Sequence, residues 1–217
     1  MITVKGLQLL KEVDLIYYPG SLLSDGTTSS FSYSILEYHQ LEKEKLKGMF
    51  LSMSDNREDA EKTYAATFQK ILVDYNNGLK VAIVSEGDIS FYSTFAYLLK
   101  HIQKHQLNLE IIAGVPSFIL GAALHQQPLA ILNERIAILP RMKDIENLKR
   151  YLDEFETVVL IKVRSVMPAL KGLLETLPIN MVYCERLGTA QQFITTNLED
   201  LANRAIPYFS LLILKKT

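Results

Sequence analysis

The chain has 217 residues, and its 23 basic and 24 acidic side chains give a formal net charge of −1 at pH 7. This balance argues against a nucleic-acid-binding protein, because such proteins carry an excess of basic residues that neutralises phosphates. Hydrophobic residues make up 48% of the sequence, which excludes wholesale disorder and suffices for one large domain or two domains of about 100 residues each.

The cysteine content and the apolar runs indicate a cytoplasmic protein. The single cysteine, Cys184, excludes an internal disulfide and a multi-cysteine metal site. The first residues lack the basic and long apolar regions of a secretory signal. The longest apolar runs, such as FSLLIL, are far shorter than the roughly 20 residues that cross a bilayer. No membrane span and no structural metal are therefore expected.

The first half of the chain alternates helical and strand patterns. The predicted elements are, in chain order, a helix over 2–11, a strand over 13–19, a polar loop over 21–34, helices over 35–45 and 57–76, a strand over 81–84, a helix over 92–105 and a strand over 109–116. Pro19-Gly20 and Asn77-Gly78 are expected to end the elements that precede them. A continuous apolar strand between helices is typical of a parallel sheet covered on both faces, so this half predicts a doubly wound α/β domain.

The second half carries more strands per residue. The predicted elements are a helix over 118–125, strands over 128–132 and 135–139, a helix over 140–155, a strand over 157–163, a helix over 166–177, a strand over 179–187, a helical turn over 198–204 and a strand over 208–216. Hairpin-length connections between some of these strands predict a mixed sheet. The boundary is placed near Ala113-Gly114, which gives an N-terminal domain over 1–112 and a C-terminal domain over 113–217.

Two glycine-containing turns are candidates for a ligand site. Ser85-Glu86-Gly87-Asp88 follows the strand over 81–84 and precedes a helix, where backbone amides are free and Asp88 could accept a hydrogen bond from a ribose hydroxyl. The alternative is an ordinary turn in which Asp88 or Ser90 caps the helix. Gly114-Val115-Pro116-Ser117 repeats the pattern, and its alternative is a linker between domains.

Other side chains give no catalytic or metal-binding pattern. His101 and His105 are one helical turn apart but lack the glutamate of a zinc-peptidase helix, so surface histidines are the preferred interpretation. Cys184 is expected to be a buried apolar residue. Tyr17 and Tyr18 fit either packing or ligand contact. The residues by themselves thus indicate a two-domain α/β protein with a small-molecule site near Gly87.

Ordered motifs along the whole chain resemble one family. The segment VAIVSEGDISFYSTFAYLL is similar to the "GDPxxYSTFxYL" element of the tetrapyrrole (corrin/porphyrin) methyltransferases, in the branch that methylates carbon 20 of precorrin-2. Five further segments match in order: DLIYYPGS ("YPxS"), FLSMSDNRED ("FPMTxD"), EIIAGVPSF ("EIIPGVSSF"), TVVLIKV ("TVVLMKV") and VYCERLGTAQQFI ("VYVERxGTxxQ").

The resemblance implies a fold, a cofactor and partners. It implies two α/β domains with a cleft between them, a homodimer, S-adenosylmethionine as cofactor, and precorrin-2 or cobalt-precorrin-2 as substrate. Matched position by position, the implied cofactor-binding residues are Glu86, Gly87, Asp88, Phe91, Ser93, Thr94, Pro116, Ser117, Lys162 and Gly188. Lys162 matches a strand position and Gly188 the "GT" turn near the adenine. No metal ligand is implied, and no catalytic base is identified.

The sequence departs from the family pattern at three places. MITVKG matches only the end of the family's "GVGPGDPELLTLKA", so the first strand and its glycine-proline loop are expected to be missing. Ile89 and Ala113 stand where the family has prolines. These departures motivate a noncatalytic tetrapyrrole- or cofactor-binding protein as an alternative to the enzyme.

The implied reaction asks little of side chains. A sulfonium methyl is already electrophilic and leaves a neutral thioether, so the enzyme mainly aligns the reactants and excludes water. Arg57, Arg141 and Arg164 are candidate contacts for substrate carboxylates, with solvated surface charge as the alternative. Diphthine synthase and ribosomal RNA methyltransferases are further alternatives of the same fold, and the near-neutral charge speaks against them.

Overall fold

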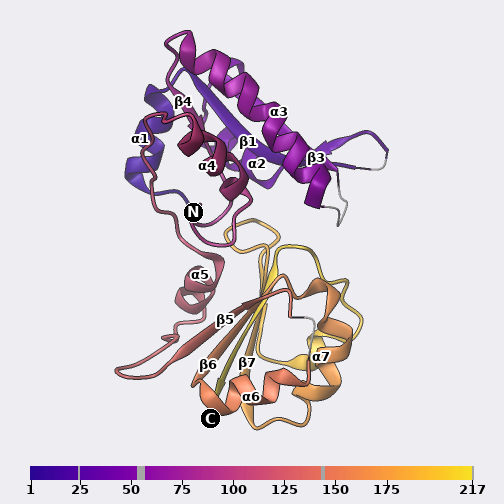
Figure 1. Cartoon of the computed structure of the whole chain (residues 1–217). Coiled ribbons are helices and arrows are strands. Elements are labelled where there is room, and N and C mark those ends of the chain that lie inside the picture. The colour runs from indigo at the N-terminus through magenta and orange to yellow at the C-terminus, as the bar shows by residue number, and fades with distance from the viewer. Residues whose placement is uncertain (24, 53–56, 143–144, 217) are drawn as a thin grey trace. The chain divides into compact units, whose positions relative to one another are not determined.

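The computed structural model describes residues 1–23, 25–52, 57–142 and 145–216, without the side chains of Ser52 and Arg57. The chain separates into two compact units, Met1–Val115 and Pro116–Thr217 (Figure 1). Residues 53–56, in the middle of the segment FLSMSDNRED, lie outside the described residues.

The first unit is a small, mostly parallel sheet with helices. Its elements are α1 (Val4–Glu12), β1 (Leu15–Leu22), β2 (Thr28–Ser29), α2 (Phe31–Tyr38), β3 (Leu46–Ser52), α3 (Arg57–Asn76), β4 (Val81–Ile83) and α4 (Phe95–Lys104). β1 lies at the centre, with parallel β3 on one edge and parallel β4 on the other. β2 pairs antiparallel with the far end of β1.

Neighbouring residues of β1 point to two separate cores. Ile16 belongs to a cluster with Leu10 of α1 and Leu36 of α2. Tyr17 belongs to a cluster with Phe68 of α3 and Leu98 of α4. Because successive strand residues face opposite sides of a sheet, helices cover both faces. The predicted doubly wound arrangement is confirmed (Figure 1).

The prediction that Pro19-Gly20 ends the first strand is wrong. β1 continues to Leu22. Its pairing with β4 stops at Tyr17 and its pairing with β2 starts at Ser21, so Pro19 has a strand neighbour on the β3 side only. A proline lacks the amide hydrogen that a second neighbour would need, and sheets accept it at such one-sided positions.

The polar segment over 21–34 is also more regular than expected. Residues predicted as a loop over 21–34 form the end of β1, the short strand β2 and the start of α2. Ser30 caps α2, since its hydroxyl accepts a hydrogen bond from the Tyr33 amide at 3.0 Å. α2 ends at Tyr38 rather than at residue 45, and Lys43–Lys45 form a 3-10 turn.

Two predicted strands are absent from the described sheets. Residues 107–116 are irregular, and Leu109 and Ile111 are 39% and 47% exposed. No described strand pairs with the second edge of β4. Residues 128–132 are irregular as well, with Ile131 52% exposed. Both runs are short. A short apolar run forms a strand only where it can pair with another strand and pack its side chains against a core.

The sheet of the second unit is mixed, as predicted, and has five strands. Its elements are α5 (Ser117–Leu124), β5 (Ile136–Pro140), α6 (Asn147–Glu154), β6 (Thr157–Ile161), α7 (Met167–Leu174), β7 (Ile179–Glu185), β8 (Phe193–Thr195) and β9 (Ser210–Lys216), with 3-10 turns at Val163–Ser165 and Leu198–Leu201. The strand order is β5-β6-β9-β7-β8. β5 and β6 are parallel, whereas β9 runs antiparallel to both of its neighbours.

Helices also pack on this second sheet. α6 and α7 contribute Leu148, Leu152, Met167 and Leu170 to its main core. α5 approaches the sheet closely at Gly121, where an added Cβ would lie 3.2 Å from the Cys184 sulfur. Cys184 is fully buried, as predicted, and burial raises the pKa of its thiol to about 12. The thiol is therefore protonated and unreactive in the native state.

Three helices are followed by the same dipeptide, His-Gln. His39-Gln40, His105-Gln106 and His125-Gln126 follow α2, α4 and α5, and each glutamine has a positive φ, between 53° and 58°. A residue in the left-handed region is a common way to end a helix. These three histidines thus occupy C-cap positions, and His101 stacks on Phe68 with ring centroids 5.1 Å apart.

Candidate functional site

The turn after β4 is organised by one carboxylate. Asp88 Oδ1 accepts hydrogen bonds from the backbone amide of Ser90, at 2.8 Å, and from its hydroxyl. Asp88 Oδ2 accepts one from the amide of Gly114, at 2.7 Å. These bonds, led by the Ser90 hydroxyl, lower the pKa of Asp88. Asp88 therefore joins the two glycine-containing turns that the sequence singled out.

Gly114 fits this junction because it has no side chain. An added Cβ would lie 2.1 Å from the carbonyl oxygen of Gly87, which is far inside van der Waals contact. Gly87 itself has φ of +76°, a conformation that glycine adopts without strain. The backbones of the two turns are thus in direct contact, and both positions favour glycine.

The remaining predicted residues of this turn also contact the protein. Glu86 Oε1 accepts a hydrogen bond from Ser32 at 2.8 Å. The Ser93 and Ser85 hydroxyl oxygens are 2.9 Å apart, and the Thr94 hydroxyl is 2.5 Å from the Tyr64 phenol oxygen. α4 starts only at Phe95, so Ser93 and Thr94 precede the helix. The turn is held from several sides before any ligand binds.

A small hollow lies beside the turn that follows the carboxyl end of β4. Pro19 of β1, Met49 of β3 and Val84-Ser85 after β4 line it, together with Thr94. In open parallel sheets, ligands bind outside the carboxyl ends of the strands. The predicted turn therefore occupies the edge where a small-molecule site is expected.

The second unit holds the other predicted cofactor residues. Pro116 and Ser117 stand at the start of α5. Lys162 follows β6 by one residue, rather than lying on the strand, and has a left-handed backbone with φ 59° and ψ 47°. Gly188 has φ of +79°, and an added Cβ would meet only Leu120, at 3.7 Å. One side of Gly188 is thus open to a ligand.

A buried polar network supports the strand that leads to Gly188. Glu185, 2% exposed, accepts hydrogen bonds from Tyr183 at 2.6 Å and from Arg204 at 2.5 Å. Burial alone would raise the pKa of Glu185, but the bonds from Arg204 and Tyr183 outweigh it, and the pKa is lowered. The Arg204 guanidinium carbon lies 3.8 Å from the centre of the Phe193 ring. Sequence reasoning missed this network, because Arg204 is 19 residues from Glu185 and no spacing rule pairs side chains so far apart.

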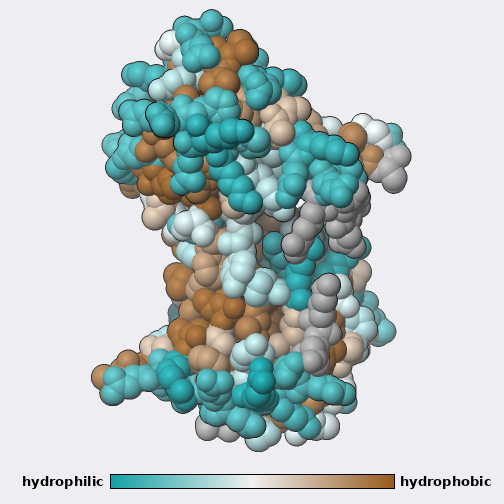
Figure 2. All heavy atoms as spheres, viewed as in Figure 1, coloured by the Kyte–Doolittle hydropathy of each residue, from teal (hydrophilic) through white to brown (hydrophobic). Residues whose placement is uncertain are grey.

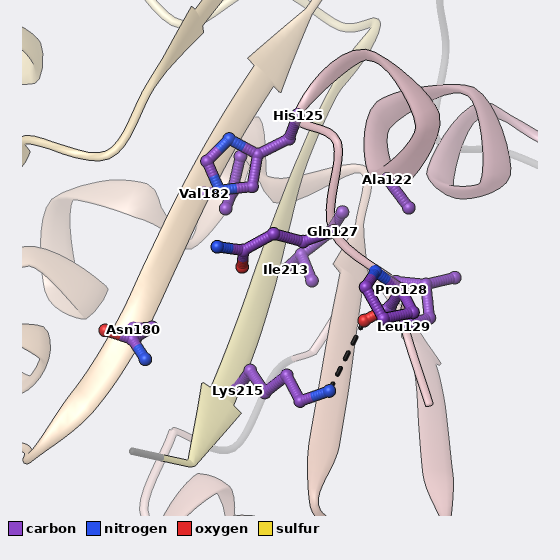
Figure 3. Close-up of a pocket in the computed structure, with 9 residues that line it drawn as sticks. All are labelled: Ala122, His125, Gln127, Pro128, Leu129, Asn180, Val182, Ile213 and Lys215. Atoms are coloured by element: carbon purple, nitrogen blue, oxygen red, sulfur yellow. Dashed lines mark hydrogen bonds between the residues drawn. The ribbon is translucent and has the colours of Figure 1, made fainter. Parts of the chain in front are cut away.

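A second hollow in this unit contains no predicted site residue (Figure 3). It lies between the end of α5 and the strands β7 and β9. The Lys215 amino group is 3.0 Å from the Glu134 carboxylate and 3.3 Å from the Pro128 carbonyl oxygen, so its charge is already paired. The lining residues are Ala122, His125, Gln127, Pro128, Leu129, Asn180, Val182, Ile213 and Lys215.

Two of the three candidate substrate-contact arginines lie on the surface. Arg141 and Arg164 are exposed. The side chain of Arg57 lies outside the described residues. Across the described ranges, no cluster of three or more His, Cys, Asp or Glu side chains could hold a metal ion. No helix in those ranges is long and apolar enough to cross a membrane.

The family model for tetrapyrrole (corrin/porphyrin) methylases matches residues 1–202. The chain belongs to this family. It is therefore a methyltransferase, and the resemblance found in the sequence motifs is confirmed.

Its relatives include enzymes named for carbon 20. A probable cobalt-precorrin-2 C(20)-methyltransferase of Methanocaldococcus jannaschii is 30% identical over 166 residues, which cover 76% of this chain and 68% of that one. The cobalt-precorrin-2 C(20)-methyltransferase of Salmonella typhimurium is 25% identical over 219 residues, covering 100% of this chain and 91% of that one. A precorrin-2 C(20)-methyltransferase of a Sinorhizobium species is 26% identical over 98% of this chain and 89% of that one.

Solved methylase structures share the fold. A cobalt precorrin-4 methyltransferase has a TM-score of 0.70 at 17% identity, over 99% of this chain and 88% of that one. A uroporphyrin-III C-methyltransferase from Thermus thermophilus, complexed with S-adenosylhomocysteine, has a TM-score of 0.64 at 15% identity, over 99% of this chain and 90% of that one.

Proposed function

We propose that the chain transfers a methyl group from S-adenosylmethionine to carbon 20 of precorrin-2 or cobalt-precorrin-2, a step of cobalamin biosynthesis in the cytoplasm. The observation that carries this proposal is the match to relatives named for carbon 20, which extends over essentially the whole chain. A single cysteine suits the reducing cytoplasm.

The described residues fit S-adenosylmethionine through their backbone groups. Gly188 offers an open side at a positive φ, and Gly87 follows the carboxyl end of β4. The carboxylates of Glu86 and Asp88 already accept hydrogen bonds from Ser32, Ser90 and Gly114. We therefore assign these two side chains to shaping the turn, and assign cofactor contact mainly to main-chain atoms.

Methyl transfer from S-adenosylmethionine requires the protein mainly to position the reactants. Bound S-adenosylmethionine supplies an electrophilic methyl group whose departure needs no acid. The residues around it hold the nucleophilic carbon in line with that methyl and exclude water. Ser85, Ser93 and Thr94 fix the turn at the sheet edge through their hydroxyl groups, so that its backbone is preorganised.

A homodimer is part of the proposal. The second unit exposes large apolar side chains, and the segment before β5 projects from it (Figure 1), with hydrophobic side chains toward the tip of the projection beside hydrophilic ones (Figure 2). Leu132, in this segment, is 99% exposed. Exposed apolar groups of this kind are typical of surfaces that a partner covers. Members of this exposed apolar set include Ile119, Leu124, Ile131 and Leu132.

Methyl transfer can be followed directly. The chain is incubated with precorrin-2, or with its cobalt form, and with S-adenosylmethionine that carries a ¹³C-labelled methyl group. Formation of S-adenosylhomocysteine together with a labelled methyl at carbon 20, seen by NMR, is expected. Binding of S-adenosylhomocysteine without methyl transfer to either substrate would contradict the proposed activity.

A further inference from the structure

Three strands of the second sheet are followed by the same unusual feature. Arg141 comes directly after β5, Lys162 after β6 and Arg186 after β7, and their φ values are 46°, 59° and 48°. Non-glycine residues seldom adopt positive φ, and the conformation costs free energy. In each case the residue that carries it is a cation.

The strand pairing brings these cations to one edge. β5 is parallel to β6, and β6 and β7 are both antiparallel to β9, so β5, β6 and β7 all end at the same side of the sheet. The Arg141 amide donates to the Ile161 carbonyl at 3.1 Å, next to Lys162. Further along the edge, the amides of Lys162 and Arg186 donate to the carbonyls of Ser210 and Phe209, at 3.2 and 2.9 Å. We call Arg141, Lys162 and Arg186 the basic edge.

Little negative charge opposes the basic edge. None of its three side chains forms an ion pair with a residue in the described part of the chain. Arg186 donates to the neutral Gln191 amide oxygen at 2.9 Å. Glu185 is the acidic neighbour along the chain, and its carboxylate is already paired with Arg204. The edge thus retains positive charge that an anionic ligand can use.

Exposed aromatic residues accompany the cations. Tyr208 and Phe209 immediately precede β9, which starts at the edge where its neighbours end, and they are 42% and 40% exposed. Their rings contact each other, with centroids 5.2 Å apart. Cations and exposed aromatic rings at the same sheet edge suit a ligand with a flat apolar body and peripheral carboxylates. A tetrapyrrole with acetate and propionate side chains has this chemistry.

We propose that the basic edge binds peripheral carboxylates of the tetrapyrrole substrate. The proposal rests on the proposed function for the identity of that substrate. Such contacts are remote from the reacting carbon and the same in ground and transition states, so their loss raises KM and leaves kcat nearly unchanged.

The chain itself suggests suitable substitutions. Gln40, Gln106 and Gln126 adopt the same left-handed conformation as the three cations. Arg141→Gln and Arg186→Gln therefore remove charge without imposing a new backbone requirement. The matched control is the double substitution Lys149→Gln and Arg150→Gln, which removes two exposed charges from α6 in the same unit.

The probe is uroporphyrin III, a stable carboxylated tetrapyrrole whose binding to the full chain needs no turnover. We expect the double variant R141Q/R186Q to bind it at least about tenfold more weakly, because hydrogen bonds to charged groups are strong enough for a factor of ten each. K149Q/R150Q and the unaltered chain should bind alike. Affinity for S-adenosylhomocysteine, measured by calorimetry, should be unchanged in R141Q/R186Q.

Three results would overturn the inference. The first is unchanged uroporphyrin III binding by R141Q/R186Q. The second is an equal loss in K149Q/R150Q, which would indicate unspecific attraction. A loss of S-adenosylhomocysteine binding without a loss of uroporphyrin III binding would likewise assign the edge to the cofactor. If the unaltered chain fails to methylate precorrin-2, the proposed function fails, but the uroporphyrin III comparison still decides on the edge.

Discussion

Asp88 illustrates how a local motif acquires its role from a distant residue. The sequence identifies Gly87-Asp88 as a turn at a strand end, because the pattern is local. The bond from the Gly114 amide to Asp88, at 2.7 Å, joins residues 26 positions apart. Such a contact depends on how the unit packs, and no spacing rule predicts it.

Asp25 provides a natural control for Asp88. Its carboxylate accepts hydrogen bonds from the Thr27 amide and hydroxyl, as that of Asp88 does from Ser90, but Asp25 lies in the exposed β1–β2 turn. Asp88→Ala should lower the free energy of unfolding by about 1–2 kcal/mol, since it leaves the Gly114 amide without its partner. Asp25→Ala should cost less. Urea unfolding measures both, and equal losses would refute a special role for the Gly114 bond.

The lowered pKa of Glu185 predicts that the free energy of unfolding decreases at acid pH. Its pKa is lowered in the native state, so the unfolded chain binds the proton more readily, with a pKa of about 4.3. The stabilisation is therefore fully present above that pKa and is lost as the pH falls through the lower native value. Glu185→Gln should destabilise the chain by about 3 kcal/mol at pH 7, because it leaves Arg204 with a partly buried, unpaired charge.

The measurement is urea unfolding of both proteins from neutral to acid pH. The difference in unfolding free energy should shrink below about pH 4. Tyr183→Phe, which removes one of the two donors to Glu185, should shift the loss toward higher pH. A difference that stays constant with pH would contradict the assignment.

At the scale of elements, prediction succeeded where several local features agreed. The helix over 57–76 has a long periodic pattern and a clear stop, and α3 has these bounds. The runs over 109–116 and 128–132 offered only a few apolar residues, and neither is a strand. The strand β8 was missed because three residues carry too little pattern.

Two glycines should respond to alanine in opposite directions. Gly78 follows α3 and has φ of +83°. Its amide donates a hydrogen bond to the Tyr75 carbonyl at 3.0 Å, and the Leu79 amide donates one to the Asp74 carbonyl at 3.2 Å, as in a common helix C-cap. Gly78→Ala should destabilise by about 1 kcal/mol, because alanine disfavours this conformation. Gly172 lies within α7 with open space around it, so Gly172→Ala should stabilise by up to about 1 kcal/mol. Urea unfolding that shows the same sign for both would contradict this reading.

At the scale of the whole molecule, the α/β class followed from the pattern but the strand order did not. The final strand, β9, lies between β6 and β7, and its side chains from Leu211 to Leu214 are buried. An apolar run of this kind indicates an interior strand. Which neighbours it takes depends on pairing across the chain, which composition and spacing do not encode.

The proposed homodimer is tested on its exposed apolar segment. Ile131→Asp with Leu132→Asp places charge on the projection before β5 and should convert a dimer into a monomer, because a desolvated charge opposes association. Val73→Asp, at a 60% exposed position of α3, is the control and should leave the dimer intact. Size-exclusion chromatography with light scattering gives the masses. A monomeric unaltered chain would contradict the dimer.

Because α5 packs against Cys184 at Gly121, the reactivity of the Cys184 thiol can report on opening of the second unit. The chain has one thiol, and it is inaccessible while α5 covers the sheet at Gly121. A thiol-specific reagent such as Ellman's can therefore label the native chain only during an opening of this unit. The labelling rate measures how often that opening occurs, with no engineered cysteine and no added dye.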